Sequence, residues 1–210
     1  VYARASTKAD SLKPYHEGTV LKYKTFSKNW YQATVYINGK PQTGYINKSH
    51  VENKVKNQKV EYGVGIKQPT KVYQRASTSS KAIRSYNYGS YLKFKTFTTN
   101  WYEATVYING KATTGYIPKA DVKDLAYRLE GYAQKIPTHV YSKTSRDSDI
   151  LKSYDRGSKL KYYGYNKDWF EATVYINGNP TTGYIHVDDV AYSPKDLYMS
   201  SGYNDDFKHM

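Results

Sequence analysis

The sequence predicts an all-β protein built from three tandem copies of one small module. One stretch occurs three times, at residues 29–46, 100–117 and 168–185, and each copy carries Trp-aromatic, Ala-Thr-Val-Tyr-Ile-Asn-Gly and Thr-Gly-Tyr. The three tryptophans of the chain open these copies at positions 71 and 68 residues apart. A period of about 70 residues fixes a repeat architecture before any other feature is considered.

Each copy begins with a short strand. Residues 1–7 match residues 72–78 and, more loosely, residues 140–145. In the two later copies a further segment precedes this strand, with Pro-Thr at residues 69–70 and 137–138. We therefore expect the first copy to lack its leading strand within this chain. A polar stretch of about a dozen residues follows, which we expect to be a long loop.

A glycine ends this polar stretch in every copy, at Gly18, Gly89 and Gly157. It is consistent with a turn that needs positive φ. Residues 20–26, 91–97 and 159–163 come next, and their apolar residues alternate with lysines, the period-2 pattern of a half-buried strand.

The tryptophan opens the best-defined hairpin of each copy. Ala33, Val35 and Ile37 fall on one face of its first strand. Asn38-Gly39 and its equivalents are typical of a type I′ turn, which needs positive φ at both central positions. Residues 47–51, 118–122 and 186–190 then favour a single turn of 3₁₀ helix before a last strand.

These elements divide the chain into modules of residues 1–53, 60–123 and 127–192, called repeats 1, 2 and 3 below. Each would hold five or six short strands and no long helix, which is typical of a small barrel or sandwich. A core of this size gives little stability, so we expect repeats 2 and 3 to pack together. Residues 193–210 resemble nothing earlier and are expected to form a linker or irregular tail.

The composition excludes several classes of protein. The chain has no cysteine, which excludes disulfides, cysteine-ligated metals and a cysteine nucleophile. No apolar run approaches the length of about 18 residues that a membrane span needs, and no signal peptide is visible. A chain that opens on Val1 is expected to be a fragment or a mature form. Its 26 tyrosines suit strands whose rings pack while the hydroxyls stay hydrated, or grooves that stack on sugars or glycerol phosphate.

The formal charge of +14 is unevenly distributed. Residues 1–53 carry eight basic and three acidic side chains, and residues 54–123 carry thirteen and three. Residues 124–193 carry nine of each and are neutral. A basic field on two of three repeats favours a polyanionic partner that those repeats contact, the alternative being a solvated lysine-rich surface.

The order of these elements resembles that of the bacterial SH3-like repeats called GW modules, found in Gram-positive autolysins and surface adhesins. The resemblance rests on the glycine turn, the Leu-Lys-aromatic strand, Trp-Tyr, the Asn-Gly hairpin, Gly-aromatic-Ile and the 3₁₀ turn. It covers three copies, up to about Tyr192. Gly-Tyr stands where the family has Gly-Trp, at Gly44, Gly115 and Gly183. Three tandem SH3-like small β-barrel modules are therefore the expected fold.

The resemblance also implies a function. Such modules are non-catalytic and attach a secreted or cell-surface protein to the Gram-positive cell wall, usually by binding lipoteichoic or teichoic acid. Any amidase or glucosaminidase activity would then belong to another domain. Some relatives bind glycosaminoglycans or host proteins instead, so an adhesin is one alternative, and peptidoglycan binding is another. We expect a monomer with no cofactor.

The candidate ligand-binding residues are basic side chains on or near the second strand and the long loop, together with aromatic side chains of the hairpin. They are Arg4, Lys22, Lys24, Arg75, Lys81, Lys93 and Lys95, with Tyr36, Tyr107, Trp30 and Trp101. An ordinary solvated face is the alternative for the strand lysines. Core or groove-wall packing is the alternative for the tryptophans.

No catalytic constellation accompanies these residues. The five histidines occupy different positions of the repeat, with no metal-binding spacing. Glu103 and Glu171 are equivalent, but Gln32 replaces them in repeat 1, which a binding module tolerates more readily than an active site. No phosphate-binding loop and no nucleic-acid-binding motif is present, so we expect neither a nucleotide cofactor, nor a metal, nor a nucleic-acid partner.

Overall fold

The computed structural model describes residues 1–199, and for Tyr198 and Met199 the backbone alone. Its sheets are antiparallel in every pairing that is resolved, which confirms the all-β class. Among the described residues no helix has the length and apolar character needed to cross a membrane. Two units are distinguished: residues 1–61, 71–85 and 94–119 form unit 1, and residues 62–70, 86–93 and those from 120 onward form unit 2. Repeat 1 thus lies in unit 1 and repeat 3 in unit 2.

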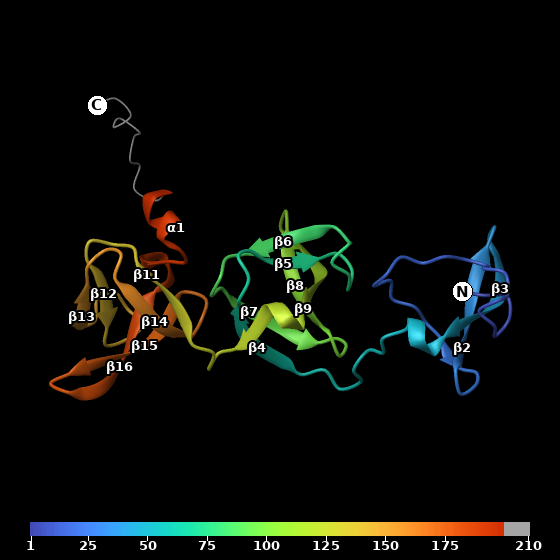
Figure 1. The fold of residues 1–210 in the computed structure, drawn as a ribbon, viewed down its shortest axis with the longest axis horizontal. Helices are drawn as coiled ribbons and strands as arrows, with labels where there is room; N and C mark the ends of the chain where they lie inside the picture. The colour runs from blue at the N-terminus through green and yellow to red at the C-terminus, as the bar shows by residue number, and fades with distance from the viewer. Residues whose placement is uncertain (200–210) are drawn as a thin grey trace, which may run out of the picture. The chain divides into compact units, whose positions relative to one another are not determined.

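Repeat 1 forms a three-stranded sheet in the order β1-β2-β3, of which Figure 1 labels β2 and β3. Its elements are β1 (Lys24–Thr25), β2 (Trp30–Ile37), β3 (Lys40–Asn47) and the 3₁₀ turn η1 (Lys48–His50). The strand predicted at residues 20–26 is therefore reduced to two residues, and Val20 is 64% exposed. In repeat 3 the equivalent strand pairs on its outer side with a leading strand, which repeat 1 lacks among its described residues. Without that ladder the segment stays irregular.

Repeat 2 contributes a seven-stranded sheet in the order β10-β4-β7-β8-β9-β5-β6. Its elements are β4 (Val60–Gly65), β5 (Thr70–Tyr73), β6 (Ala82–Tyr86), β7 (Tyr91–Thr96), β8 (Trp101–Ile108), β9 (Lys111–Pro118), η2 (Lys119–Asp121) and β10 (Val122–Asp124). Leu92 and Phe94 of β7 are each 4% exposed and their lysine neighbours are exposed, as the alternating pattern predicted.

Repeat 3 forms a second seven-stranded sheet, in the order β13-β12-β16-β15-β14-β11-β17. Its elements are β11 (Leu129–Ala133), β12 (Thr138–Tyr141), β13 (Ile150–Tyr154), β14 (Lys159–Gly164), β15 (Trp169–Ile176), β16 (Asn179–His186), η3 (Val187–Asp189) and β17 (Val190–Ala191). Seven strands exceed the five or six expected. A strand inside the predicted long loop accounts for the difference, since the last strand was expected.

The strand inside the long loop was missed because it is short and mostly polar. β6 and β13 each hold one side chain, Ile83 or Leu151, that packs beneath the hairpin at Gly115 or Gly183. In repeat 1 the same segment contains Pro14, where the later repeats have serine. Proline has no N–H to donate to a ladder, and this segment of repeat 1 keeps only a single bridge, between Tyr2 and Ser11.

The three hairpins have the predicted turns. Asn38, Asn109 and Asn177 have φ of 47°, 49° and 50°, and the glycine after each also has positive φ. The turn glycines that end the polar stretch have φ of 75° to 86°. All three 3₁₀ turns form where they were expected.

The glycine of each Gly-Tyr pair is required by close packing. A Cβ at Gly183 would lie 2.5 Å from Val140 Cγ1 and 3.2 Å from the carbonyl oxygen of Tyr141, on the strand that crosses the hairpin. Gly44 and Gly115 meet Val1 and Val72 in the same way. The tyrosine after the glycine packs on an aromatic ring instead, as Tyr184 does on Tyr165 with centroids 5.0 Å apart.

The core of unit 2 joins repeat 3 to residues of repeat 2, as expected. Val64, from β4, is fully buried in a cluster with Leu129, Tyr162 and Phe170, among others. Partly buried Ile66 and Tyr88 pack against the same cluster. A Cβ at Gly164 would lie 2.5 Å from Val64 Cγ1, so β4 and β14 are in close contact here.

The segment after repeat 3 differs in part from the irregular tail that was expected. Pro194–Met199 form the helix α1. Ser193 precedes it, and its backbone N–H and hydroxyl both donate to Asp196, at 3.0 and 2.8 Å, which caps the first turn. The Arg156 guanidinium donates to the Leu197 carbonyl oxygen. The rest of the predicted tail, residues 200–210, lies outside the described residues.

Candidate basic and aromatic binding surface

The strand lysines predicted as ligand contacts are exposed. Lys24 lies on β1 opposite Gln32, and Lys95 lies on β7 opposite Glu103. Lys22 and Lys93 are also exposed. Because Glu103 faces Lys95 and also lies 4.0 Å from Lys54, it offsets part of the positive charge of repeat 2 at this position. In repeat 1 the neutral Gln32 leaves the charge of Lys24 uncompensated across the strand pair.

Lys93 lies beside a pair of stacked tyrosines. Its ammonium is 6.0 Å from the Tyr62 ring, which stacks on Tyr91 with centroids 5.5 Å apart. Burial, and after it the nearby Tyr62, raises the pKa of Tyr91 above its ordinary value. The Tyr91 phenol therefore stays neutral at physiological pH, and the pair presents ring faces and hydroxyls next to a cation.

The basic residues of the long loop are in different situations. Arg4 and Lys81 are exposed. Arg75 is half-buried, and its Nε donates to the Glu17 carbonyl oxygen at 3.2 Å, while the Ser77 hydroxyl donates to the Glu17 carboxylate at 2.8 Å. Arg75 is thus held by the glycine turn of repeat 1. To contact a ligand, its side chain would have to leave the Glu17 carbonyl oxygen.

The candidate tryptophans hold the hairpin against the first strand. Trp30 meets the edge of Tyr2 at 5.9 Å, Trp101 meets Tyr73 at 6.1 Å, and the third tryptophan meets Tyr141 at 5.8 Å, all nearly perpendicular. This edge-to-face geometry is favourable and repeats in all three copies. It favours the packing interpretation of Trp30 and Trp101 that the sequence left open.

Tyr36 and Tyr107 are in a different position. They lie on the outward face of their hairpins and are 61% and 66% exposed, and the third equivalent, Tyr175, is 65% exposed. No aromatic partner covers them in the ring contacts of the described residues. Tyr36 and Tyr107 are exposed enough to contact a ligand, although the structure does not bring them together with the strand lysines.

Two lysines that were missed complete this surface. Lys48 Nζ lies 5.0 Å from the centre of the Tyr31 ring, and Lys119 Nζ lies 5.2 Å from that of Tyr102. These pairs occupy equivalent positions, and repeat 3 has valine and phenylalanine there. The signal in the sequence was the coincidence of lysine and tyrosine in repeats 1 and 2 and the loss of both in repeat 3.

The lysine–tyrosine pair of repeat 1 sits in a hydroxyl-rich cluster. Tyr31 packs on Tyr23 with centroids 4.3 Å apart. The Tyr23 hydroxyl donates to Asn53 Oδ1 at 2.6 Å, and the Asn53 amide donates to the Tyr31 hydroxyl at 3.2 Å. Burial, and after it Tyr31, raises the pKa of Tyr23. A cation over a ring, flanked by hydroxyl and amide groups, suits a ligand with both phosphate and polyol parts.

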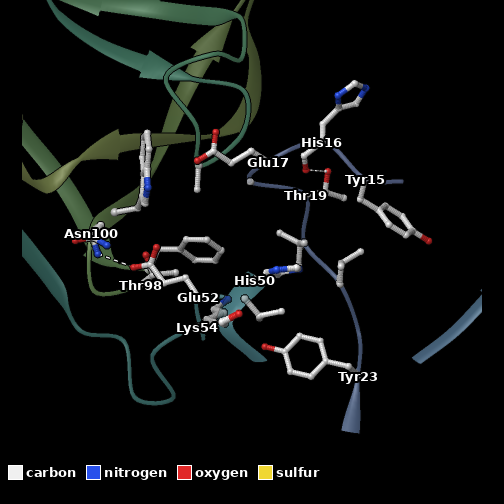
Figure 2. Close-up of a pocket in the computed structure, with 18 residues that line it drawn as sticks. Tyr15, His16, Glu17, Thr19, Tyr23, His50, Glu52, Lys54, Thr98 and Asn100 are labelled. Carbon is white, nitrogen blue, oxygen red and sulfur yellow. Dashed lines mark hydrogen bonds between the residues drawn. The ribbon is translucent and has the colours of Figure 1, made fainter. Parts of the chain in front are cut away.

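A cavity of about 530 Å³ in unit 1 has another character (Figure 2). Glu17 and Glu52 line it, and Figure 2 shows Glu52 directed at the backbone N–H of Asn100, which donates to it at 2.8 Å. Thr98, 3% exposed, also lines the cavity, and its hydroxyl has no hydrogen-bond partner among the described residues. The wall carries two carboxylates against one lysine, Lys54, so this cavity is unsuited to a polyanion.

Two further features concern the acidic and histidine side chains. No group of three or more histidine, cysteine or acidic side chains within residues 1–199 could hold a metal ion. The buried Asp189 is 2% exposed and accepts two hydrogen bonds from Arg146, at 2.8 and 2.9 Å, so it serves an ion pair.

Comparison with known proteins adds little. No family model and no curated protein matches the chain. Solved structures of NlpC2 and NlpC1 from Trichomonas vaginalis are each 14% identical, with a TM-score of 0.27, over 66% and 68% of this chain. The chain covers 50% and 49% of their lengths, about half of each. The native structure of CBDP35 is 17% identical, with a TM-score of 0.25, over 65% of this chain and 98% of that one. Superpositions this loose assign neither a family nor a function.

Proposed function

We propose that this chain is an array of non-catalytic, SH3-like modules of the GW type that binds a polyanionic polymer of the Gram-positive cell surface, teichoic or lipoteichoic acid. The observation that carries the proposal is the lysine held over a tyrosine ring at the same position of both basic repeats, where the neutral repeat has Val187 and Phe170. In a poly(glycerol phosphate) chain, phosphate would meet the ammonium and glycerol the ring and hydroxyls. The protein would then act at the cell surface or in the cell wall.

The strand lysines extend this surface. Several lysines can each contact one phosphate of a polymer that carries a phosphate at every repeat. Each contact releases counterions, so the affinity depends steeply on the salt concentration. Two basic repeats in one chain gain avidity by engaging the same polymer. Teichoic acid is therefore favoured over the nearly neutral peptidoglycan. Glycosaminoglycan or a host protein, as for an adhesin, stays the second candidate because a sulfated glycan offers the same anionic repeat.

The test is retention of the full chain on purified Gram-positive walls, with and without teichoic acid, over a salt series. We expect retention to fall steeply as NaCl rises to about 1 M. Teichoic acid removal should abolish it. Retention that persists at high salt contradicts a polyanionic ligand, and retention on stripped walls indicates peptidoglycan. Retention on a glycosaminoglycan column, measured over the same salt series, tests the adhesin alternative. Stronger retention there than on the walls would favour that alternative.

A pair of matched variants locates the site. Lys48→Ala with Lys119→Ala should lower the slope of log retention against log salt by about 1.4, since each lost phosphate contact contributes about 0.7 for a flexible polyanion. Lys8→Ala with Lys111→Ala removes the same charge from the same two repeats at exposed positions. Equal losses from the two pairs would mean that net charge, rather than the lysine–tyrosine pairs, determines binding.

A further inference from the structure

Unit 2 contains a cleft of about 810 Å³ that shares only Tyr91 with the basic and aromatic surface described above. The segment 86–91 of repeat 2, which carries the turn glycine, forms one wall, and the 3₁₀ turn η3 and the segment that follows it form the other. Tyr86, Tyr88, Tyr91 and Tyr192 line it together with the ring of Phe170. Phe170 is 3% exposed and packs 3.4 Å from the position of a Cβ at Gly89. The aromatic part of the wall is thus anchored in the core.

The polar groups of the cleft are held in place by one another. The Gln68 side-chain oxygen accepts the Tyr88 backbone N–H at 2.6 Å, and its nitrogen donates to Asn87 Oδ1 at 3.4 Å. The Asn87 side chain in turn hydrogen-bonds the Tyr192 hydroxyl. Burial, most of all, and then Asp196 and Asp188 raise the pKa of Tyr192, while this hydrogen bond lowers it. Two carboxylates therefore lie near a neutral phenol.

The charges in this cleft cancel. Lys135 and Lys167 line it, and so do Asp188 and Asp196. Lys167 is also within 3.6 Å of the Asp168 carboxylate. A polyanion would meet two carboxylates here, so the cleft has no electrostatic preference of the kind seen on the basic repeats. A neutral ligand would meet no net electrostatic repulsion in this cleft.

We propose that this cleft binds an uncharged saccharide. Aromatic rings offer flat apolar faces for the C–H face of a sugar, and sugar hydroxyls can donate to carboxylates and accept from amides. A concave site with several aromatic side chains and a few fixed polar groups is the form that small-ligand sites take. Asp188, whose side chain is 75% exposed and whose carboxylate lies 3.6 Å from His186 Nδ1, is a hydrogen-bond acceptor open to solvent. This gives unit 2 a ligand of its own, held between repeat 3 and residues 68–91 of repeat 2, whether or not the basic surface binds teichoic acid.

The experiment is calorimetric titration of the full chain with chitotetraose, cellotetraose and maltotetraose as neutral probes. At least one should bind with a Kd below about 1 mM, and the Kd should change less than about twofold between low salt and about 1 M NaCl. If none of the three binds, or if binding weakens steeply with salt, the proposal is overturned.

Variants place the binding in this cleft. Asp188→Asn keeps the shape and removes a charged acceptor, so it should weaken binding about tenfold. Tyr192→Phe keeps the ring and removes the hydroxyl, and it should weaken binding by a smaller factor. Tyr175→Ala, an exposed tyrosine of the same repeat, is the control and should leave the Kd unchanged. A loss with Tyr175→Ala and none with Asp188→Asn would place the saccharide on the hairpin and refute the cleft.

Discussion

The Gly-Tyr signature makes a quantitative prediction about packing in repeat 3. Gly183→Ala adds a methyl group 2.5 Å from Val140 Cγ1, and Val140 is fully buried. The strand carrying Val140 would have to move, since the Tyr141 carbonyl oxygen lies only 3.2 Å from the same methyl. Overpacking of this kind costs about 1–3 kcal/mol.

The complementary variant, Val140→Ala, removes two buried methyl groups. The lost transfer free energy is about 1.6 kcal/mol, at about 0.8 for each carbon, and the cavity adds to it, so about 2–3 kcal/mol is expected. In the double variant the new methyl at residue 183 occupies the space that the valine leaves. Its loss of stability should therefore fall below the sum of the two single losses by at least about 1 kcal/mol.

The assay is equilibrium urea unfolding of the full chain, followed by tryptophan fluorescence, since Trp169 belongs to the same hairpin. Thr182→Ala, at the neighbouring exposed position, is the control and should change stability by less than about 0.5 kcal/mol. Additive losses in the double variant, within about 0.5 kcal/mol, would refute the steric account of the glycine.

Three further predictions follow from buried groups of unit 2. Burial, and after it Tyr88 and Tyr192, raises the pKa of Tyr162. The neutral phenol therefore stabilises the fold fully below about pH 10, and this stability is lost as pH rises further. Tyr162→Phe should reduce that alkaline loss in a pH series of thermal melts, and an unchanged pH dependence would contradict the prediction. Arg146→Ala leaves the buried Asp189 carboxylate without its partner and should lower the free energy of unfolding by about 3 kcal/mol. Arg146→Lys cannot restore both hydrogen bonds, so it should recover only part of that free energy. Full recovery by lysine would show that the charge alone matters. Val64→Ala should lower the melting temperature of unit 2 and speed hydrogen exchange in both β4 and β14, and exchange that changes in β4 alone would show that Val64 does not couple the two repeats.

Local patterns in the sequence were sufficient for the hairpins and turns. Asn38-Gly39 and the turn glycine Gly18 have the positive φ that their chemistry favours, because such conformations are decided by the residues themselves. The strand at β6 was not predictable in this way. Its single packed residue, Ile83, gains its role from Gly115, which lies on a different strand 32 positions along the chain.

The candidate site was predicted less well than the fold, for the same reason. The exposed strand lysines follow from alternation, since a half-buried strand must place Lys93 and Lys95 in solvent. Lys48 and Lys119 were missed because they lie in 3₁₀ turns while their partners, Tyr31 and Tyr102, lie on the first strand of the hairpin. Only the fold brings each lysine over its ring. Arg75 was predicted as a ligand contact, and only the fold shows that Glu17 holds it.

The change at the lysine–tyrosine position has a physical cause in the packing of repeat 3. The residue equivalent to Tyr31 and Tyr102 there is Phe170, which is buried in the core cluster, and Val187, in place of the lysine, packs against that cluster. A lysine at residue 187 would lose solvation beside an apolar core, which is costly. The surface that presents charge in repeats 1 and 2 is therefore an apolar surface in repeat 3. The neutrality of repeat 3 at this position follows from its packing onto residues of repeat 2, and this is why the polyanion is expected on the two repeats whose equivalent tyrosines stay partly exposed.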